Sequence, residues 1–326
     1  MIEVDVSPFE ERHAALQVEL EARAFANVAE SARPKDSAAY LDHVHGAKNP
    51  AGRAWIAVAR EDDRAVGSAA ALPARFARRD GRILIGWQVG TFVVDAAQQR
   101  KGIGTALLAA LSGALKDRPD SFLYSYPNRR SIPVFERHGY SRKGRTPTRI
   151  FLPARGPGKA WEIRRIARAE VPKLLASLPA PARPPDGFVR DARYFEWRFA
   201  SAEAENRYRF VHCREKDGPS AFVIALAAHR FAGQSFGVLA DAYPDVLDAH
   251  LGTAVRASLA EGRKDGSRFL YATATIRDGA RAPWSVAVPE SRDPRPVVLV
   301  VHEETKIVAP EEIAASRVMT ADWGGF

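Results

Sequence analysis

The sequence contains very little sulfur and no long apolar run, and each shortage excludes a class of protein. Cys213 is the only cysteine among 326 residues, so an internal disulfide and a cysteine-based zinc site are excluded. No uncharged apolar stretch approaches the roughly 20 residues that a membrane-spanning helix requires. Residues 1–5 carry carboxylates and no basic segment, which is unlike a cleaved signal peptide. We therefore expect a cytoplasmic protein without membrane insertion.

The remaining composition is that of an ordinary globular protein. Hydrophobic residues make up 46% of the chain and charged residues 27%, which is unlike disordered, coiled-coil and collagen-like sequences. At roughly 150 residues per domain, the length of the chain predicts two domains.

The net charge of +9 lies almost entirely in the first half of the chain. Residues 1–160 hold 25 basic and 17 acidic side chains, whereas residues 161–326 hold 23 and 22. The densest basic stretch is 129–149, in which Glu136 is the only acidic residue. A concentrated positive field attracts anions. Nucleic acid, a membrane surface and a phosphorylated small molecule are the candidate partners, and solubility alone is the alternative.

Hydrophobic periodicity predicts alternating strands and helices in both halves. In the first half we expect helices near 7–25, 36–44, 102–117 and 129–138, and strands at 1–6, 53–61, 65–73, 83–95, 121–126 and 148–153. In the second half we expect helices at 169–178, 191–201 and 245–261, and strands at 162–166, 207–213, 221–231, 235–242, 268–275 and 297–302. The Gly- and Pro-rich stretch 155–160 is the expected linker between domains 1–155 and 161–326.

The two halves also resemble each other in residues, which predicts an internal duplication. A shift of 148 places 104–107 (GTAL) on 252–255 (GTAV), and a shift of 147 places 122–124 (FLY) on 269–271 (FLY). Several matches in the same order, at nearly constant offset, are harder to obtain by chance than one.

The segment 93–105 (VVDAAQQRKGIGT) is the most informative for chemistry, because it runs from a strand through a loop into a helix. Gly102 and Gly104 stand where that helix begins, so backbone N–H groups are open to a ligand. The first-turn N–H groups lack acceptors within the helix and lie at the positive end of its dipole. This arrangement suits a phosphate, and Arg100 and Lys101 add positive charge beside it.

This segment resembles the GNAT superfamily of acyl-CoA-dependent N-acetyltransferases, whose hallmark is Gln/Arg-x-x-Gly-x-Gly/Ala. Residues 99–104 (QRKGIG) match it, and 128–140 (NRRSIPVFERHGY) is similar to a second stretch of the family, an asparagine followed by a helix and a Gly-aromatic ending. The regions around Tyr40 and 49–52 (NPAG), and 194–199 (YFEWRF) in the second half, are similar to a tandem-domain subgroup with a degenerate second copy.

The resemblance implies an α/β (α+β) fold of two GNAT-like domains, each a mixed twisted sheet flanked by helices, with a splayed sheet at the acyl-CoA site of the first. Acetyl-CoA or another acyl-CoA would be the co-substrate, without a metal. Its pantetheine arm would pair with the backbone near 92–94 and its pyrophosphate would sit on 99–104. Basic residues of 129–149 could neutralise its 3′-phosphate. The implied cofactor-binding residues are Phe92, Val93, Val94, Gln99, Arg100, Lys101, Gly102, Ile103, Gly104, Thr105, Asn128 and Arg130.

The chain departs from the family pattern where catalysis is concerned. Many members place a tyrosine, the general acid, where this chain has Phe135, and some place a glutamate base where it has Gln88. The candidate catalytic residues of this chain are Gln88, Tyr126 and His45. Tyr124 and Tyr126 are candidate substitute acids, with Tyr126 favoured, although a buried tyrosine more often only packs. His45, at the end of the second expected helix, is a candidate base, and the alternative is a solvated helix end.

In the second half the duplication aligns Gln99 with Leu247 and Gly102 with His250, so we expect one acyl-CoA site per chain, in the first half. The second domain would shape the acceptor pocket or act as a scaffold. The aromatic residues of 194–199 could form an acceptor wall, or pack against a sheet as such residues more often do. Cys213 is expected to be a buried small hydrophobe.

The leading hypothesis is an N-acyltransferase that transfers the acyl group to a primary amine by direct attack on the thioester. The acceptor would be a small-molecule amine, with an amino sugar as one candidate, and the sequence does not show which. The alternative is a non-catalytic acyl-CoA-binding or sensor protein, motivated by Phe135 and Gln88. A nucleic-acid binder ranks last, because the motifs of such folds are absent. The oligomeric state is open.

Overall fold

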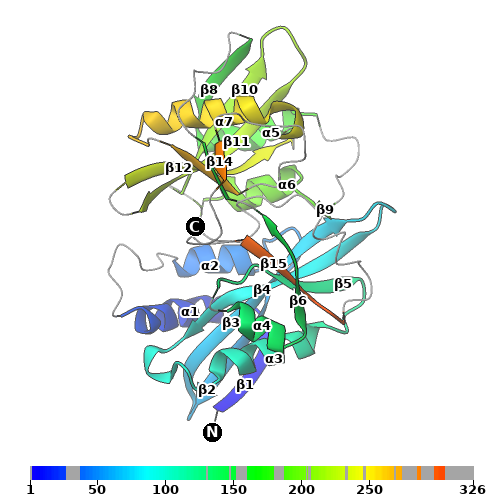
Figure 1. The fold of residues 1–326 in the computed structure, drawn as a ribbon, viewed down its shortest axis with the longest axis vertical. Helices are drawn as coiled ribbons and strands as arrows, with labels where there is room; N and C mark the ends of the chain where they lie inside the picture. The colour runs from blue at the N-terminus through cyan, green and yellow to red at the C-terminus, as the bar shows by residue number, and fades with distance from the viewer. Residues whose placement is uncertain are drawn as a thin grey trace. The chain divides into compact units, whose positions relative to one another are not determined.

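The computed structural model describes residues 2–26, 37–129, 131–146, 148–151, 160–179, 187–202, 204, 207–231, 234–244, 247–267, 269–273, 285–287 and 297–304. The chain divides into two compact units (Figure 1). One consists of Met1–Gly144 with Val298–Ala314, and the other of Arg145–Val297 with Ala315–Phe326.

A mixed sheet forms the middle layer of the first unit. Its spatial order is β1-β2-β3-β4-β5-β15-β6. Strands β1 to β4 pair antiparallel, β4 and β5 pair parallel, and β15 pairs antiparallel with β5. The strands span β1 (Ile2–Pro8), β2 (Trp55–Glu61), β3 (Arg64–Ala77), β4 (Ile83–Val94), β5 (Ser121–Ser125), β6 (Tyr140–Thr146) and β15 (Val297–His302).

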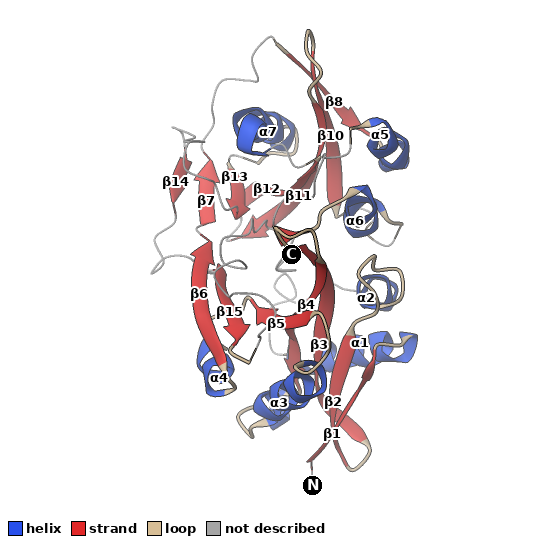
Figure 2. Cartoon of the chain, turned by 90° about the vertical axis from the view of Figure 1, so that its right-hand side faces the viewer, coloured by secondary structure: helices blue, strands red, loops and turns tan. Residues whose placement is uncertain are grey.

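Helices cover both faces of this sheet (Figure 2). Helices α1 (Glu11–Ala24) and α2 (Ala38–His45) lie on one face, and α3 (Ile103–Leu115) and α4 (Ile132–Arg137) lie on the other. A 3₁₀ turn, η2 (Ala96–Gln98), leads from β4 towards α3. Helix α3 presents apolar side chains at the spacing of one helical face, and these pack on the sheet in the larger core of the unit: Ile103, Leu107, Leu108, Leu111 and Leu115.

The second unit is built in the same three layers. Its sheet contains β8 (Trp161–Ile166), β10 (Tyr208–Glu215), β11 (Ala221–Phe231), β12 (Gln234–Tyr243), β13 (Leu270–Thr273), β7 (Thr148–Phe151) and β14 (Ser285–Ala287), in this spatial order. Helix α7 (Leu247–Arg263) lies on one face, and α5 (Val171–Ser177) and α6 (Ala192–Phe195) lie on the other. The remaining elements are β9 (Gly187–Phe188), η3 (Arg168–Glu170) and the π-helical turn η4 (Glu196–Ala200).

The two sheets share one strand order, and each takes its sixth strand from the other half of the sequence. Strand β15 comes from near the C-terminus and stands between β5 and β6, where Figure 1 shows it in orange-red among blue and green strands. Strand β7 precedes the second half and stands between β13 and β14. In both sheets the fourth strand pairs parallel with the fifth, β4 with β5 and β12 with β13.

This exchange corrects the expected domain boundary. The sequence placed 148–153 in a first domain and 297–302 in a second, whereas β7 belongs to the second unit and β15 to the first. Of the expected linker 155–160, only Ala160 lies within the described residues. Strand pairing between distant segments leaves no local trace in a sequence, because any apolar strand of matching length can fill a place in a sheet.

Most expected elements are present within a few residues of their predicted ends, and the α+β class with two sheets is confirmed. The expected helix 191–201 is instead α6 followed by the π-helical turn η4. Within the described residues, none of the helices combines the length and the hydropathy needed to span a bilayer.

Candidate functional site

Strand β4 is interrupted by a bulge near its C-terminal end. Ala70 of β3 pairs with Gly90 and Ser68 pairs with Val93, so β4 has one residue more than β3 over this interval. Thr91 has φ +52°, in the left-handed region, which is typical of a bulged strand. Beyond the bulge, Phe92 and Val94 pack against the core that α3 and α4 cover.

The sheet opens next to this bulge. The parallel pairing of β4 with β5 ends at Gln88 and Tyr124, while β4 continues for six more residues to Val94. The hydroxyl of Ser125, the last residue of β5, donates to the carbonyl of Val89 of β4 (2.5 Å) and holds the two strands together one residue beyond their last paired positions. The backbone of β4 from Gly90 onward therefore has no β5 partner, as the expected splayed sheet requires.

Helix α3 begins at an open glycine. Gly102 is its N-cap with φ +81° and no side-chain cap, and Ala106 N donates to the Gly102 carbonyl (3.0 Å). The N–H groups of the first turn therefore have no acceptor within the helix. A Cβ added to Gly102 or Gly104 would meet no heavy atom within 4 Å. The two glycines border open space, and side chains there would fill it.

A pocket of about 440 Å³ lies over this helix start and joins it to the end of β4. Its wall combines the bulged strand, the loop, the start of α3 and two further helices. The lining residues are Ala24, Phe25, Phe92, Val94, Gln98, Gln99, Arg100, Gly102, Ile103, Gly104, Thr105, Ser131, Val134 and Phe135.

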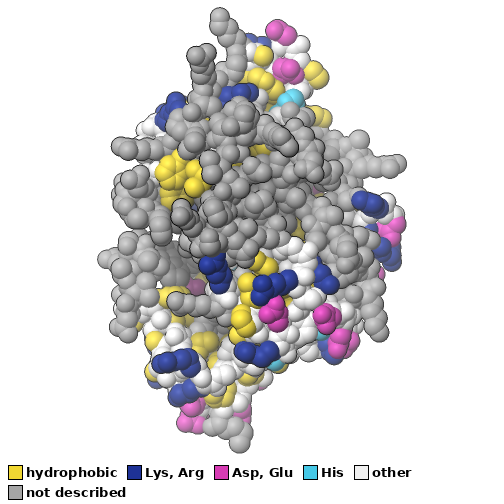
Figure 3. All heavy atoms as spheres, viewed as in Figure 1, with side chains coloured by type: hydrophobic (Ala, Val, Ile, Leu, Met, Phe, Trp, Pro, Cys, Tyr) yellow, Lys and Arg dark blue, Asp and Glu magenta, His cyan; other side chains and the backbone are white. Residues whose placement is uncertain are grey.

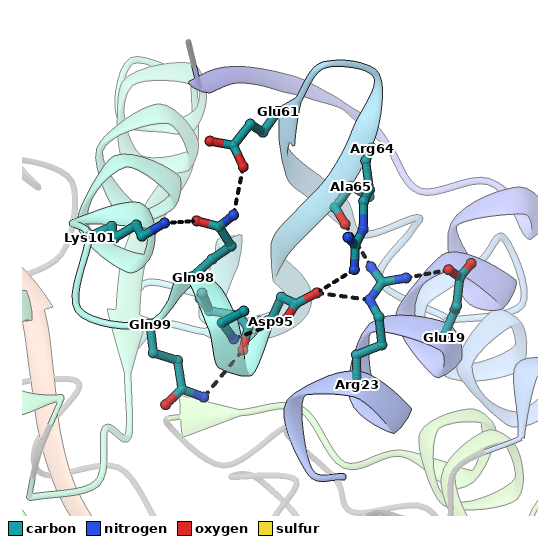
Figure 4. A network of polar contacts seen from close by, with 11 residues as sticks. Glu19, Arg23, Glu61, Arg64, Ala65, Asp95, Gln98, Gln99 and Lys101 are labelled. Carbon is teal, nitrogen blue, oxygen red and sulfur yellow. Dashed lines mark hydrogen bonds and ion pairs between the residues drawn. The ribbon is translucent and has the colours of Figure 1, made fainter.

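Side-chain hydrogen bonds hold the loop in shape (Figure 4). Gln98 Nε2 donates to Glu61 Oε2 (2.6 Å), and Gln98 Oε1 accepts from Lys101 Nζ (2.7 Å). Gln99 Nε2 donates to the carbonyl of Val94 (3.3 Å) and ties the loop to the strand that precedes it. Lys101 is thus turned toward Gln98 and is absent from the pocket wall.

The pocket brings together eight of the twelve predicted cofactor-binding residues: Phe92, Val94, Gln99, Arg100, Gly102, Ile103, Gly104 and Thr105. Val93 is buried, and its neighbours on either side line the pocket. Asn128 Oδ1 accepts from the backbone N–H (3.0 Å) and hydroxyl (3.1 Å) of Ser131, so it shapes the turn that leads into α4. Arg130 lies outside the described residues.

Two of the three predicted catalytic residues stand where the sheet opens. Gln88 pairs with Tyr124 at the last parallel rung, and the ring centroids of Tyr124 and Tyr126 are 5.7 Å apart. Gln88 and Tyr126 are half-buried, whereas Tyr124 is fully buried. The hydroxyl of Tyr126 is itself buried beside the split, and neither Tyr126 nor Gln88 is among the residues that line the pocket.

His45 lies elsewhere, at the last residue of α2, and its side chain is buried. It is 3% exposed, and its ring packs on Phe9 at 4.9 Å between centroids. His43 is 4% exposed. The solvated helix end considered for this segment is therefore wrong, and the role of His45 as a base stays a prediction.

Sequence reasoning missed part of the wall. Ala24 and Phe25 come from the end of α1, and nothing in their local sequence marks them as ligand-facing. Phe135 does line the pocket, as its alignment with the family's tyrosine implied. It is 2% exposed and contacts the rings of Phe92 (5.8 Å between centroids) and Tyr140 (5.0 Å).

The corresponding helix start in the second unit is blocked. His250, aligned with Gly102, is the one non-helical residue within α7. Its ring stacks on Phe222 (6.1 Å between centroids) and meets Trp161 edge-on (5.0 Å). At the position that the alignment gives to Gly102, the second unit therefore has an imidazole packed against two aromatic rings.

Three of the four aromatic candidates of the second half, and Cys213, pack in its cores. Phe195 and Phe199 are fully buried, and Tyr194 packs in the same core under the sheet, which confirms the packing alternative for them. Cys213 is buried as expected, and burial raises the pKa of its thiol to about 12. A thiol with such a pKa is a poor nucleophile at neutral pH.

Positive charge is dispersed over the face shown in Figure 3, where Lys and Arg side chains alternate with Asp and Glu on its described part. Arg142 of the basic stretch donates from Nε to Glu136 Oε1 (2.7 Å), and Lys116 pairs with Glu304 (2.8 Å). Within the described residues, no three His, Cys, Asp or Glu side chains are grouped closely enough to hold a metal ion.

Comparisons with known proteins agree with this geometry. Residues 17–140 match the family described as Acetyltransferase (GNAT) family. The fold is similar to a GCN5-related N-acetyltransferase from Anabaena variabilis (TM-score 0.60, 10% identity, 92% of this chain and 72% of that chain). It is also similar to a probable N-acyltransferase of unknown function from Enterococcus faecalis (0.57, 14%, 93% and 73%).

A third similar structure is a tandem GNAT protein from the clavulanic acid biosynthesis pathway (TM-score 0.54, 14% identity, 94% of this chain and 100% of that chain). At these identities the likeness concerns the fold. No curated protein sequence matches the chain.

Proposed function

Because residues 17–140 belong to the GNAT acetyltransferase family, we propose that this chain transfers the acyl group of acetyl-CoA to the primary amine of a small molecule. The family consists of acyl-CoA-dependent N-acyltransferases that acylate amine acceptors. The observation that carries the proposal is the pocket in which the bulged end of β4 meets the open glycines of α3.

The residues of this pocket fit an acyl-CoA. The free N–H groups at the start of α3 and the open space over Gly102 and Gly104 suit a diphosphate. The edge of β4 that has no β5 partner beyond Gln88 suits the amides of a pantetheine arm, because a strand edge binds extended chains by main-chain hydrogen bonds. The apolar wall of Phe92, Val134 and Phe135 suits the methylene groups of that arm.

Acyl-CoA, when bound, supplies the activated thioester. The neutral amine would attack the thioester carbon, so that a C–N bond forms and the C–S bond breaks. Tyr126 would donate a proton to the departing sulfur. Gln88 would orient the amine or a water molecule by hydrogen bonding, and water would take up the amine proton, because the amide of Gln88 does not titrate.

Binding and turnover test the proposal separately. Titration calorimetry with acetyl-CoA should give one site per chain. Release of free thiol should then depend on an amine from a panel of amino sugars, polyamines, aminoglycosides and peptides. Folded protein that binds no acetyl-CoA would refute the proposal.

The role of Tyr126 is tested by Tyr126→Phe. Loss of a general acid should lower kcat by about a hundredfold or more and leave the KM for acetyl-CoA unchanged. Tyr124→Phe, which removes the neighbouring hydroxyl, is the matched control and should leave kcat close to that of the wild type. Equal effects of the two variants would count against Tyr126 as the acid.

A second candidate function is an acyl-CoA-binding protein without turnover. It is favoured by Phe135, which lines the pocket and has no proton to donate, and by Gln88 at the position of the family's base. It predicts saturable acetyl-CoA binding with no amine-dependent thiol release. Acetylation of even one amine of the panel would exclude it.

A further inference from the structure

A buried carboxylate joins two parts of the pocket wall that lie far apart in the sequence, since Asp95 and its partner Arg23 are separated by 72 positions. The side chain of Asp95, directly after β4, is 7% exposed. Its Oδ2 accepts from Arg23 Nε (3.0 Å) and from Arg64 Nη2 (3.1 Å), and its Oδ1 accepts from Ala97 N (3.1 Å) (Figure 4). Helix α1, the β2–β3 hairpin and the loop before α3 therefore meet at one side chain.

The backbone of Asp95 is also held on both sides. Its N–H donates to the carbonyl of Val66 (2.9 Å), and its carbonyl accepts from Gln98 N (2.8 Å). The first residue of the loop is thus fixed to β3, and the turn that follows is closed by hydrogen bonds from the carboxylate and the carbonyl of the same residue.

Arg23 carries this constraint to α1. Its Nη2 donates to the carbonyl of Ala65 (2.7 Å), and its Nη1 contacts Glu19. The next two residues, Ala24 and Phe25, line the pocket. A planar guanidinium that donates in two fixed directions leaves little freedom to the helix end that bears it.

We propose that Asp95 is a positioning residue for acyl-CoA: by binding Arg23 it holds the end of α1 against the loop that receives the diphosphate. This inference rests on the proposed function. The ion pair lies outside the pocket wall, so its effect on the ligand passes through Ala24, Phe25 and the loop backbone. Side chains that fix binding groups in this indirect way govern affinity through geometry.

Arg64 provides a matched control, because it donates to the same carboxylate oxygen from a different element. Its side chain is 64% exposed, whereas that of Arg23 is 24% exposed. Arg64 begins β3 and neither it nor its sequence neighbours line the pocket. If acyl-CoA affinity depends on the link between Asp95 and α1, replacing Arg23 should weaken binding more than replacing Arg64, although both arginines bind the same carboxylate.

The experiment measures acetyl-CoA affinity by calorimetry and steady-state kinetics for Arg23→Gln, Arg64→Gln and Asp95→Asn. Arg23→Gln and Asp95→Asn should each weaken binding and raise the KM for acetyl-CoA about tenfold, because small misplacements of a binding wall have effects of this order or larger. Their kcat at saturating acetyl-CoA should stay near the wild-type value. Arg64→Gln should change affinity within about twofold, as expected for an exposed ion pair.

A KM effect without a kcat effect separates positioning from a loss of folded protein, which would lower kcat and leave the KM unchanged. Thermal melting shows whether each variant is folded. Arg23→Lys is a milder replacement for use if Arg23→Gln folds poorly. Arg23→Lys retains the charge but not the two-directional fork, and should still raise the KM. Arg23→Gln combined with Asp95→Asn should raise the KM little more than either change alone.

Equal losses of affinity in Arg23→Gln and Arg64→Gln would overturn the inference, because the carboxylate would then act only through its cap of the loop. Unchanged affinity in Arg23→Lys and Asp95→Asn would overturn it as well. A wild-type protein that binds no acetyl-CoA overturns the proposed function first and this inference with it, so the two failures are distinguishable.

Discussion

The starts of α3 and α7 occupy corresponding places in two sheets of the same strand order, and they have opposite characters. Gly102 in the first unit has a left-handed φ and borders open space. His250 in the second unit is covered by Trp161 and Phe222. The architecture of sheet and helix is therefore compatible with either a ligand site or a filled core, and a few residues at the helix start decide between them.

Charge follows the same division. The half of the sequence that contains the open helix start carries nearly all of the net positive charge, while the other half is close to neutral. A positive half favours the approach of a polyanionic cofactor. This division agrees with the prediction of one acyl-CoA site per chain, in the first half.

The largest expected effect comes from separating the halves at the boundary that the sequence suggested. A fragment of residues 1–155 lacks β15, which contributes four buried side chains, Val298, Leu299, Val300 and Val301. Burial of each is worth about 1.5–3 kcal/mol, and their sum is comparable to the whole stability of a typical domain. Circular dichroism should show the fragment to be largely unfolded, with no cooperative thermal transition.

The complementary fragment, 161–326, tests the same strand exchange in the second unit, because it lacks β7 and the fully buried Phe151. It should also fail to melt cooperatively. A fragment 1–155 that melts cooperatively and binds acetyl-CoA would show that the strand exchange is dispensable.

The next largest effect is expected from a glycine-to-glutamate substitution, made in turn at the starts of α3 and α7. Gly102→Glu places a bulky, negatively charged side chain at the start of α3, where the negatively charged diphosphate is proposed to bind. It should weaken acetyl-CoA binding by at least about a hundredfold. Gly252→Glu is the matched change in the second unit. A Cβ there meets only the Arg256 guanidinium at 3.5 Å, an ordinary contact, so acetyl-CoA affinity should stay within about twofold of the wild type.

Calorimetry measures both affinities, and thermal melting controls for folding, since Gly102→Glu also carries a backbone cost of about 1–2 kcal/mol from its positive φ. If Gly252→Glu weakens binding as much as Gly102→Glu does, the assignment of the site to the first unit is wrong.

A smaller effect is expected from His250→Gly, which restores the glycine that the alignment places there. Loss of its ring contacts with Trp161 and Phe222 should destabilise the protein by about 1 kcal/mol. The stoichiometry of acetyl-CoA should remain one per chain, because Leu247 still replaces the Gln99 anchor. Appearance of a second acetyl-CoA per chain would mean that His250 alone closes the second site.

The smallest expected effect is a pH dependence of stability that both units share. Burial lowers the pKa of His302 below its ordinary value of 6.5, with Glu304 and Glu303 opposing and Lys116 reinforcing. Burial, then Arg164 and Arg214, lowers the pKa of His212 in the second unit. As the pH falls below 6.5, both histidines are protonated in the unfolded chain before they are protonated in the folded protein. The free energy of unfolding is therefore at its full value above pH 6.5 and decreases as the pH falls towards the lowered pKa values of the folded protein.

Thermal melting at pH 5.0 and 7.5 measures this loss. His302→Phe keeps a ring against Tyr140, which lies 4.9 Å from the His302 ring centroid-to-centroid, and removes the titrating group. It should reduce the difference between the two melting temperatures, and His212→Phe is the matched change in the other unit. An unchanged difference in both variants would place the pH dependence on other groups.

Local features of the sequence were sufficient for most of the fold. The apolar face of α3 and the turn residues around the strands predicted element types and approximate ends correctly. The loop before α3 was also predictable, because a strand, two glycines and a helix follow one another within 13 residues. These properties depend on backbone preferences and on side-chain spacing over a few residues.

Other parts of the site depended on distant segments. Ala24 and Phe25 reach the pocket because α1 crosses the sheet at that point, and Asp95 meets Arg23 across 72 positions of sequence. His45 is buried because Phe9 covers it, although its place at a helix end suggested solvent. Such contacts follow from packing, and no short stretch of sequence contains them.

The sequence by itself determined the alternation of strands and helices, the open start of α3 and the loss of the corresponding glycine in the second half. The tertiary structure alone decided that β15 and β7 exchange places between the two sheets, and that one buried carboxylate joins α1 to the loop. The physical reason is range: dihedral preference and amphipathic spacing act between near neighbours in the chain, whereas strand pairing and buried ion pairs select their partners in space.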